Sequence, residues 1–155
     1  MGTKVKVGLA STILVIALTA LAFNLHVSIV PQVHAEETEA CTNQTLVGRY
    51  GFTGEGFFAS SNTFFPAADV GVFVSDGDGN VFGSDTVSAG GQITSRTFTG
   101  TYKVNSDCTG STALQFNPGP AVDIAIVSDD RGREVRTLQT NPQGAVFTVF
   151  ARKVR

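Results

Sequence analysis

From Cys41 onward the sequence alternates apolar and polar residues with a period of two, and short turn motifs interrupt this alternation. In residues 97–104, aromatic, glycine and valine residues occupy the even positions, whereas threonines and a lysine occupy the odd ones. Because successive side chains of a strand point to opposite faces, this pattern is typical of a half-buried β-strand. No window of ten or more residues in this part has the 3.6-residue period of a helix. The sequence therefore predicts an all-β fold.

Eight such stretches follow one another, and most are tied to the next by a short connection rich in Gly, Asn, Asp and Pro. Short connections favour an antiparallel up-and-down order, and closing the sheet removes its exposed edges. We therefore predict an eight-stranded antiparallel up-and-down barrel, with a β-sandwich as the alternative. The expected strands cover residues 46–58, 69–75 and 81–88, a fourth stretch that ends at Val104, and residues 111–116, 121–128, 134–140 and 145–154.

The inward face of this barrel is predicted to be rich in aromatic residues. In the first strand the even positions hold Tyr50, Phe52 and Phe58, with glycines between them. Alternation of large and small residues suits the interior of a narrow barrel. If the interior contains a pocket for a small apolar or amphipathic ligand, we expect the residues that line it to be Tyr50, Phe52, Phe98 and Tyr102.

The first 35 residues are predicted to be a signal peptide. Lys4 and Lys6 precede an apolar run over residues 7–23, and Ala35 ends a small-x-small cleavage pattern. Cleavage after Ala35 leaves one domain, residues 36–155, which we expect to be secreted or periplasmic and to have no membrane association. An uncleaved anchor is the first alternative, although the apolar run is short for a membrane span. A lipid on Cys41 is the second, although the preceding residues lack the leucine of a lipoprotein signal.

Cys41 and Cys108 are the two cysteines of the chain. A single pair in an exported protein predicts a disulfide between them. In an up-and-down barrel, the start of the first strand and the end of the fourth lie at the same end. The predicted topology therefore allows the two cysteines to meet there.

Composition argues against several classes of function. Both histidines, His26 and His34, lie in the leader, so the exported part has no imidazole to shuttle protons. That part retains nine of the eleven Lys and Arg residues against all thirteen Asp and Glu, and this acidic balance argues against nucleic-acid binding. No nucleophile motif of the Gly-x-Ser-x-Gly or Ser-x-x-Lys kind occurs. We expect no cofactor, and the sequence leaves the oligomeric state open.

Carboxylate or phenol chemistry is the remaining catalytic possibility. Asp85 shares its parity with the apolar side of its strand, which directs its side chain inward, whereas Glu55 and Asp123 fall on the outward side. A register shift or bulge before Asp85, which would direct it outward, is the alternative. Burial of a carboxyl group raises its pKa, which is a common property of catalytic acids and bases. Asp85, Tyr50 and Tyr102 are therefore the candidate catalytic residues, although we expect a protein without enzymatic activity.

Asp76, Asp78 and Asn80 stand at alternate positions, as the first ligands of a calcium loop do. The pattern fails further on, because Val81 and Val87 occupy the places where such a loop has Gly and Glu. The glycines between these residues also suit a tight hairpin turn. We predict a turn and retain Asp76, Asp78 and Asn80 as alternative metal ligands.

Residues 59–66 are predicted to form the longest connection, with Phe57, Phe58, Phe64 and Phe65 in or beside it. We expect these phenylalanines to form a hydrophobic plug that closes one mouth of the barrel. A lid over a ligand cavity and a surface for a protein partner are the alternatives.

The segment Gly48-Arg49-Tyr50 resembles the Gly-x-Trp signature of the calycin-type barrels, the lipocalins and avidins, with Tyr in place of Trp. In those barrels a basic residue of the last strand stacks on the aromatic ring, which implies that Arg152 stacks on Tyr50. The resemblance implies a fold and a compartment, and no activity. A wider pattern resembles uncharacterised secreted bacterial proteins with an allene oxide cyclase-like barrel. It consists of Cys41, Leu46-x-Gly48-x-Tyr50, Asp76-Gly77-x-Gly79, Gly100-Thr101-Tyr102 and Asp107-Cys108-Thr109-Gly110.

Three functions follow from these observations. The first is a non-catalytic module that binds a small apolar or amphipathic ligand, or a structural surface protein. The second is a cyclase or isomerase of the allene oxide cyclase-like class, which needs little acid–base machinery. The third is a protein-interaction domain that uses the Phe-rich segment 57–65.

Overall fold

A computed structural model describes residues 40–60 and 63–155 of the chain. The predicted signal peptide, its cleavage site and the alternative membrane anchor lie outside the described residues. Within the described part, no helix is long and apolar enough to span a membrane.

The described residues form eight strands and two short 3₁₀-helices. In chain order these are η1 (Asn43–Leu46), β1 (Gly48–Ser60), β2 (Thr63–Ser75), β3 (Asn80–Ala89), β4 (Gln92–Val104), β5 (Thr109–Asn117), β6 (Ala121–Asp129), η2 (Asp130–Gly132), β7 (Glu134–Asn141) and β8 (Val146–Lys153).

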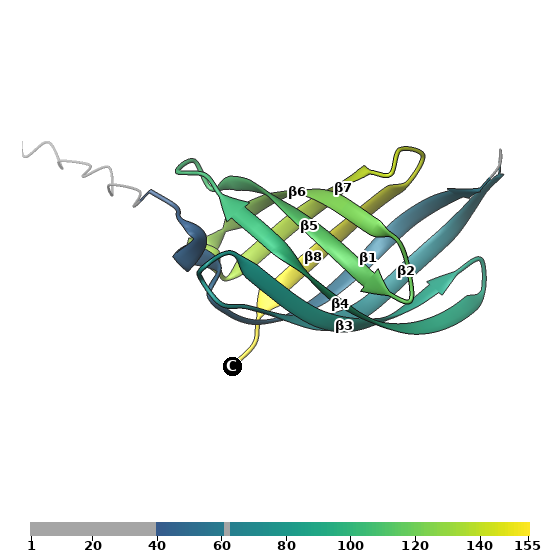
Figure 1. Cartoon of the computed structure of the whole chain (residues 1–155), viewed down its shortest axis with the longest axis horizontal. Coiled ribbons are helices and arrows are strands. Elements are labelled where there is room, and N and C mark those ends of the chain that lie inside the picture. Colours follow the sequence, from purple (N-terminus) through teal and green to yellow (C-terminus); the bar gives the residue numbers. More distant parts are fainter. Residues whose placement is uncertain (1–39, 61–62) are drawn as a thin grey trace, which may run out of the picture. The chain divides into compact units, whose positions relative to one another are not determined.

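Each strand pairs with the next in antiparallel orientation, and β8 pairs with β1 to close the barrel (Figure 1). The prediction of an eight-stranded antiparallel up-and-down barrel is confirmed, and the sandwich alternative is wrong. Closure gives every strand a hydrogen-bonded neighbour on both sides, so no strand has a free edge. This explains how strands with many small residues, such as β1 with its four glycines, hold together.

The buried core lies inside the barrel, and Leu46 of η1 belongs to it. Every second residue of a strand points inward. Examples are Tyr50 and Phe52 on β1 and Phe98 and Tyr102 on β4, all four of which are buried. Val122 and Ile126 on β6 point inward, and Ile124 between them is half-buried against the same core. The outward positions of the same strands carry mainly Thr, Ser and charged side chains, which accounts for the alternation seen in the sequence.

One end of the barrel is closed by η1 and a disulfide (Figure 1, left). The structure joins Cys41 to Cys108 with their Cα atoms 5.0 Å apart, so the predicted pairing agrees with the geometry. Tyr102 fixes η1 from inside, because its hydroxyl donates to the Asn43 carbonyl (3.0 Å) and accepts the Gly77 N–H (3.0 Å). Leu46 then covers the interior from this side and is 4% exposed.

The prediction of a Phe-rich connection over residues 59–66 is wrong. β1 continues to Ser60 and β2 begins at Thr63, and the pairs Ala59–Phe64 and Phe57–Pro66 extend the ladder through the whole segment. Pro66 is tolerated in β2 because it lies beyond the last residue pair that joins β2 to β3. Its carbonyl accepts a hydrogen bond from Gly90, which follows β3. The N–H that proline lacks would point to the same side, where the β2–β3 ladder has already ended. Figure 1 shows the β1–β2 hairpin extending beyond the β5–β6 and β7–β8 hairpins.

The predicted stacking of Arg152 on Tyr50 is also wrong. In the pairing of β1 with β8, Tyr50 lies opposite Lys153, whereas Arg152 lies opposite Gly51 and points outward to Glu134 (3.2 Å). The Lys153 ammonium lies 5.5 Å from the centroid of the Tyr50 ring. A basic residue of the last strand therefore does approach the aromatic ring. It is Lys153, because Lys153 lies on the same face of the sheet as Tyr50 and Arg152 lies on the opposite face.

Candidate binding cavity

A cavity of about 360 Å³ lies inside the barrel, and most residues of the buried core also line it. Its wall is predominantly apolar and comes from all eight strands, so distant parts of the sequence contribute to one surface. A cavity of this size and polarity is at the small end of those that hold small organic ligands. Its aliphatic wall includes Leu114, Val122, Ile124, Ile126 and Val149, and its aromatic wall includes Phe52, Phe58, Phe73, Phe98, Phe116 and Phe147.

The cavity reaches the end of the barrel opposite the disulfide, where the β1–β2, β5–β6 and β7–β8 turns lie. There it is lined by Ala59, Pro120, Pro142 and Gln143, which come from the ends of three hairpins and are exposed to solvent. The phenylalanines of the β1–β2 hairpin divide between two faces. Phe58 points inward and stacks on Phe147 with ring centroids 5.1 Å apart, whereas Phe64 on the outside is 65% exposed.

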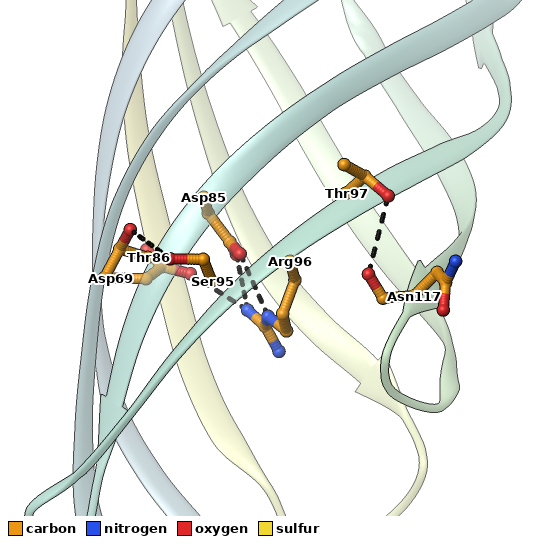
Figure 2. Close-up of polar contacts among 7 residues, drawn as sticks. All are labelled: Asp69, Asp85, Thr86, Ser95, Arg96, Thr97 and Asn117. Carbon is orange, nitrogen blue, oxygen red and sulfur yellow. Dashed lines mark hydrogen bonds and ion pairs between the residues drawn. The ribbon is translucent and has the colours of Figure 1, made fainter.

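An ion pair lies inside this apolar wall. Arg96 on β4 binds Asp85 on β3 through two hydrogen bonds, from Nε to Oδ1 (2.9 Å) and from Nη2 to Oδ2 (2.5 Å) (Figure 2). The Asp85 side chain is 1% exposed. The guanidinium also lies over the ring of Phe116, 4.2 Å from its centroid, which adds a cation–π contact. Two-point binding satisfies both oxygens of Asp85 and makes this buried pair neutral.

A second carboxylate, Asp69 on β2, lies beside this pair. Its Oδ2 is 3.7 Å from Arg96 Nη2, and its side chain is 5% exposed (Figure 2). Its Oδ1 is buried and has no hydrogen-bond partner. Two carboxylates therefore share one guanidinium, and Asp85 has the shorter contacts.

The missing side chain of Gly54 makes room for Asp69. A Cβ at Gly54 would lie 2.5 Å from Asp69 Oδ1, 2.6 Å from Phe147 Cε1 and 2.9 Å from Val149 Cγ2. The free oxygen thus lies against an aromatic and aliphatic wall. Burial, reinforced by the charge of Asp85, raises the pKa of Asp69 to about 6. Arg96 and the nearby Gly54 N–H, which lies outside hydrogen-bond geometry, offset only part of this effect.

The four residues predicted to bind a ligand lie at different depths. Phe52, Phe98 and Tyr102 line the cavity, whereas Tyr50 lies below it with no exposed surface. Tyr50 stacks on Phe73 with centroids 4.8 Å apart, and its hydroxyl donates to the Gly132 carbonyl (2.5 Å). Its place is therefore in the closed end of the barrel, where it ties β1 to η2.

The candidate catalytic residues have their reactive atoms occupied. Burial raises the pKa of Tyr50 to about 12 and also raises that of Tyr102, so both phenols stay protonated near neutral pH. Asp85 points inward, as its parity predicts, but Arg96 binds both of its oxygens. Glu55 and Asp123 are exposed on the outside, as predicted.

Sequence reasoning missed Asp69 and Arg96 as interior residues. The signal that would have found Arg96 is the β3–β4 hairpin, because counting outward from its turn places Arg96 opposite Asp85. Asp69 has the same parity as Phe73 and Ser75, which also point inward. Both residues were obscured by the conspicuous valines and threonines on the outward faces of their strands.

Residues 76–80 form the predicted turn, which the Asp76 N–H closes on the Asn80 carbonyl (3.1 Å). The Asp76 carboxylate accepts hydrogen bonds from the backbone of Asp78 (2.8 Å) and Asn80 (2.9 Å) and from the Asn80 side-chain amide (2.6 Å). These donors lower the pKa of Asp76. No group of three or more His, Cys, Asp or Glu residues arranged to hold a metal occurs in residues 40–60 and 63–155.

The fold and cavity define a small closed β-barrel with a charged group inside an apolar interior. No family model matches the chain, and no curated protein gives a significant match. Among solved structures, the chain is similar to the crystal structure of Rv2717c from M. tuberculosis, with 14% identity over 72% of this chain and 94% of that chain and a TM-score of 0.38. The resemblance to calycin-type barrels stays a prediction.

Proposed function

We propose that this protein is an exported, non-catalytic binding protein that holds a small amphipathic ligand inside its barrel. The observation that supports this proposal most strongly is the cavity itself, about 360 Å³ with a largely apolar wall and an internal charged group. An apolar wall favours the body of a ligand through the hydrophobic effect, and a few fixed polar groups orient it.

The placement of the core supports the same proposal. Tyr50 and Val104 are buried in the core and do not line the cavity, so the barrel has a packed part beside its unfilled part. A large unfilled apolar cavity lowers the stability of a protein, and such a loss of stability is typical of sites that serve a function. The disulfide is consistent with an oxidising compartment and with the predicted export.

The experiment that tests this proposal measures binding of the neutral probe N-phenyl-1-naphthylamine, which fluoresces in apolar surroundings. Thr137 and Leu138 are neighbours on β7, but Thr137 lines the cavity and Leu138 is 48% exposed on the outside. Thr137→Trp fills part of the cavity, whereas Leu138→Trp adds the same side chain outside. The chain has no tryptophan, so each variant also carries a single fluorescent reporter.

We expect saturable probe binding to the wild type and to Leu138→Trp, and binding at least about tenfold weaker to Thr137→Trp, because overfilling the cavity removes the space for the probe. Energy transfer from the new tryptophan to bound probe gives a second readout in both variants. Equal affinity in all three proteins, or no saturable binding to any of them, contradicts the proposal.

A second candidate function, a contact surface for a protein partner, is favoured by the outer face of the β1–β2 hairpin. Phe57 is 51% exposed, Phe64 is 65% exposed and Val146 beside Phe57 is 57% exposed. Segments 56–68 and 137–151, which contain these residues, have no charged side chain. Exposed apolar groups without charged neighbours are typical of interaction surfaces.

The variant for this candidate is Phe57→Ser with Phe64→Ser. Phe65 is kept because it packs inward against Phe58 (6.2 Å between centroids), which lines the cavity. Sedimentation velocity of the wild type over a concentration series tests a second copy as the partner. Concentration-dependent association that the double variant abolishes supports this function, and a monomer at every concentration argues against self-association through this face.

A further inference from the structure

We propose that the free oxygen of Asp69 is the polar anchor of the cavity and selects ligands with a protonated amine head group. This inference rests on the proposed binding function and names the chemical class of its ligand. An amphipathic amine would place its ammonium group at Asp69 Oδ1 and its apolar body along the phenylalanine and aliphatic wall.

The first support is the unpaired state of Asp69 Oδ1. The Asp69 side chain lines the cavity, is 95% buried and has one oxygen without a hydrogen-bond partner. A buried polar atom without a partner costs free energy, and a donor from a ligand that reaches it recovers this cost. The oxygen lies next to Phe147 and Val149, so the polar anchor and the apolar wall adjoin each other.

The second support is the charge balance inside the barrel. Asp85 and Arg96 neutralise each other through two short hydrogen bonds, which leaves the Asp69 carboxylate with only the 3.7 Å contact to the same guanidinium. Among the cavity-lining residues that the structure describes, Arg96 is the one cation. The lining thus holds one negative charge in excess when Asp69 is ionised, and a cationic ligand would neutralise it.

The groups that face Asp69 define its titration. Asp85 on β3 and Arg96 on β4 are the charged residues on one side. On the other side β1 and β8 present Gly54, Phe147 and Val149, none of which titrates. The pKa of Asp69 is raised to about 6, so its carboxylate is mostly ionised at pH 7.5 and mostly protonated at pH 5.

The experiment compares three probes of equal chain length, octylamine, 1-octanol and octanoate, by isothermal titration calorimetry at pH 7.5. We expect octylamine to bind at least about tenfold more tightly than 1-octanol, and octanoate to bind most weakly, because a buried carboxylate attracts the ammonium and repels the acid. Asp69→Asn should remove the preference for octylamine and leave the affinity for 1-octanol unchanged. Glu55→Gln is the matched control, since it removes an exposed carboxylate from the adjacent strand.

A second measurement uses the wild type alone and does not depend on the folding of a variant. Octylamine stays protonated between pH 5 and 7.5, whereas Asp69 gains a proton as the pH falls through about 6. We expect the affinity for octylamine to fall about tenfold from pH 7.5 to pH 5, and the affinity for 1-octanol to stay level.

The outcomes separate this inference from the proposed function. Tight octylamine binding that Asp69→Asn and low pH both weaken supports the anchor. Equal binding of octylamine and 1-octanol, unchanged at pH 5, overturns the anchor while the binding function stands. If none of the three probes binds and the naphthylamine probe also fails, the binding function and the anchor are both contradicted.

Discussion

Asp85 and Arg96 face each other directly across β3 and β4, and both side chains point into the barrel. Because directly paired residues of antiparallel strands lie on the same face, the inward placement of one requires the inward placement of the other. The result is a neutral ion pair held by two hydrogen bonds in an apolar cavity. This pair leaves the neighbouring Asp69 without a full partner.

Replacing Arg96 with methionine should destabilise the fold strongly. Arg96→Met keeps an apolar stem but leaves Asp85 and Asp69 as two uncompensated carboxylates in the interior. We expect a loss of about 3–5 kcal/mol in the free energy of unfolding at pH 7.5, measured by urea denaturation. Arg152→Met is the control, because the side chain of Arg152 is 68% exposed in its ion pair with Glu134 and should cost less than about 1 kcal/mol. Equal losses in the two variants would show that Arg96 does not compensate buried charge.

The pKa of Asp69 predicts how stability depends on pH. It is raised from 3.8 to about 6 in the folded state, so between these values the folded protein holds a proton that the unfolded chain has released. Stability should therefore fall by about 2 kcal/mol as the pH rises from 4 to 7. Asp69→Asn should flatten this profile. A wild-type stability that rises over the same range, with the variant parallel to it, would refute a raised pKa.

The barrel was predictable from the sequence because its physical signal is local. Period-two alternation marks each strand, and Gly- or Asp-containing turns separate the strands. Closure of the barrel follows because an open sheet would leave its first and last strands with unpaired edges. The disulfide followed from the same topology, since it requires only that Cys41 and Cys108 share one end of the barrel.

The inward placement of Asp69 was not predictable, because it depends on which face of its strand points inward. The stretch beginning at Asp69 carries Val70, Val72 and Val74 on one face, yet Val70 is 58% exposed and the inward parity belongs to Asp69 and Phe73. Apolar residues on both faces leave the parity undetermined. The pairing that carries Asp69 inward is set by β1, whose glycines give no hydrophobic signal at that position.

The disulfide should contribute a large share of the stability. It joins residues 67 positions apart, and restricting an unfolded loop of that length is worth about 4 kcal/mol in the chain-entropy model. We expect the double variant Cys41→Ala with Cys108→Ala to lose about this much free energy of unfolding. Urea denaturation of the oxidised wild type and the double variant measures it. A difference below about 1 kcal/mol would mean that η1 is held mainly by its hydrogen bonds.

Tyr50 should stabilise the closed end through its hydroxyl group. Tyr50→Phe keeps the stack on Phe73 but leaves the buried Gly132 carbonyl without its donor. We expect a loss of about 1–3 kcal/mol in the free energy of unfolding, with no change in probe binding, since Tyr50 lies below the cavity. A variant that keeps full stability, or one that loses probe binding, would contradict the place assigned to Tyr50.

The most direct test of ligand binding inside the barrel is a methyl-resolved NMR titration of the wild type with octylamine at pH 7.5. We predict saturable shifts in the methyl groups of Leu114, Ile124 and Val149, which line the cavity, and none in the outward methyl groups of Val127 and Leu138. Shifts confined to the outward groups, or to Val146 beside the exposed β1–β2 hairpin, would contradict an interior ligand site.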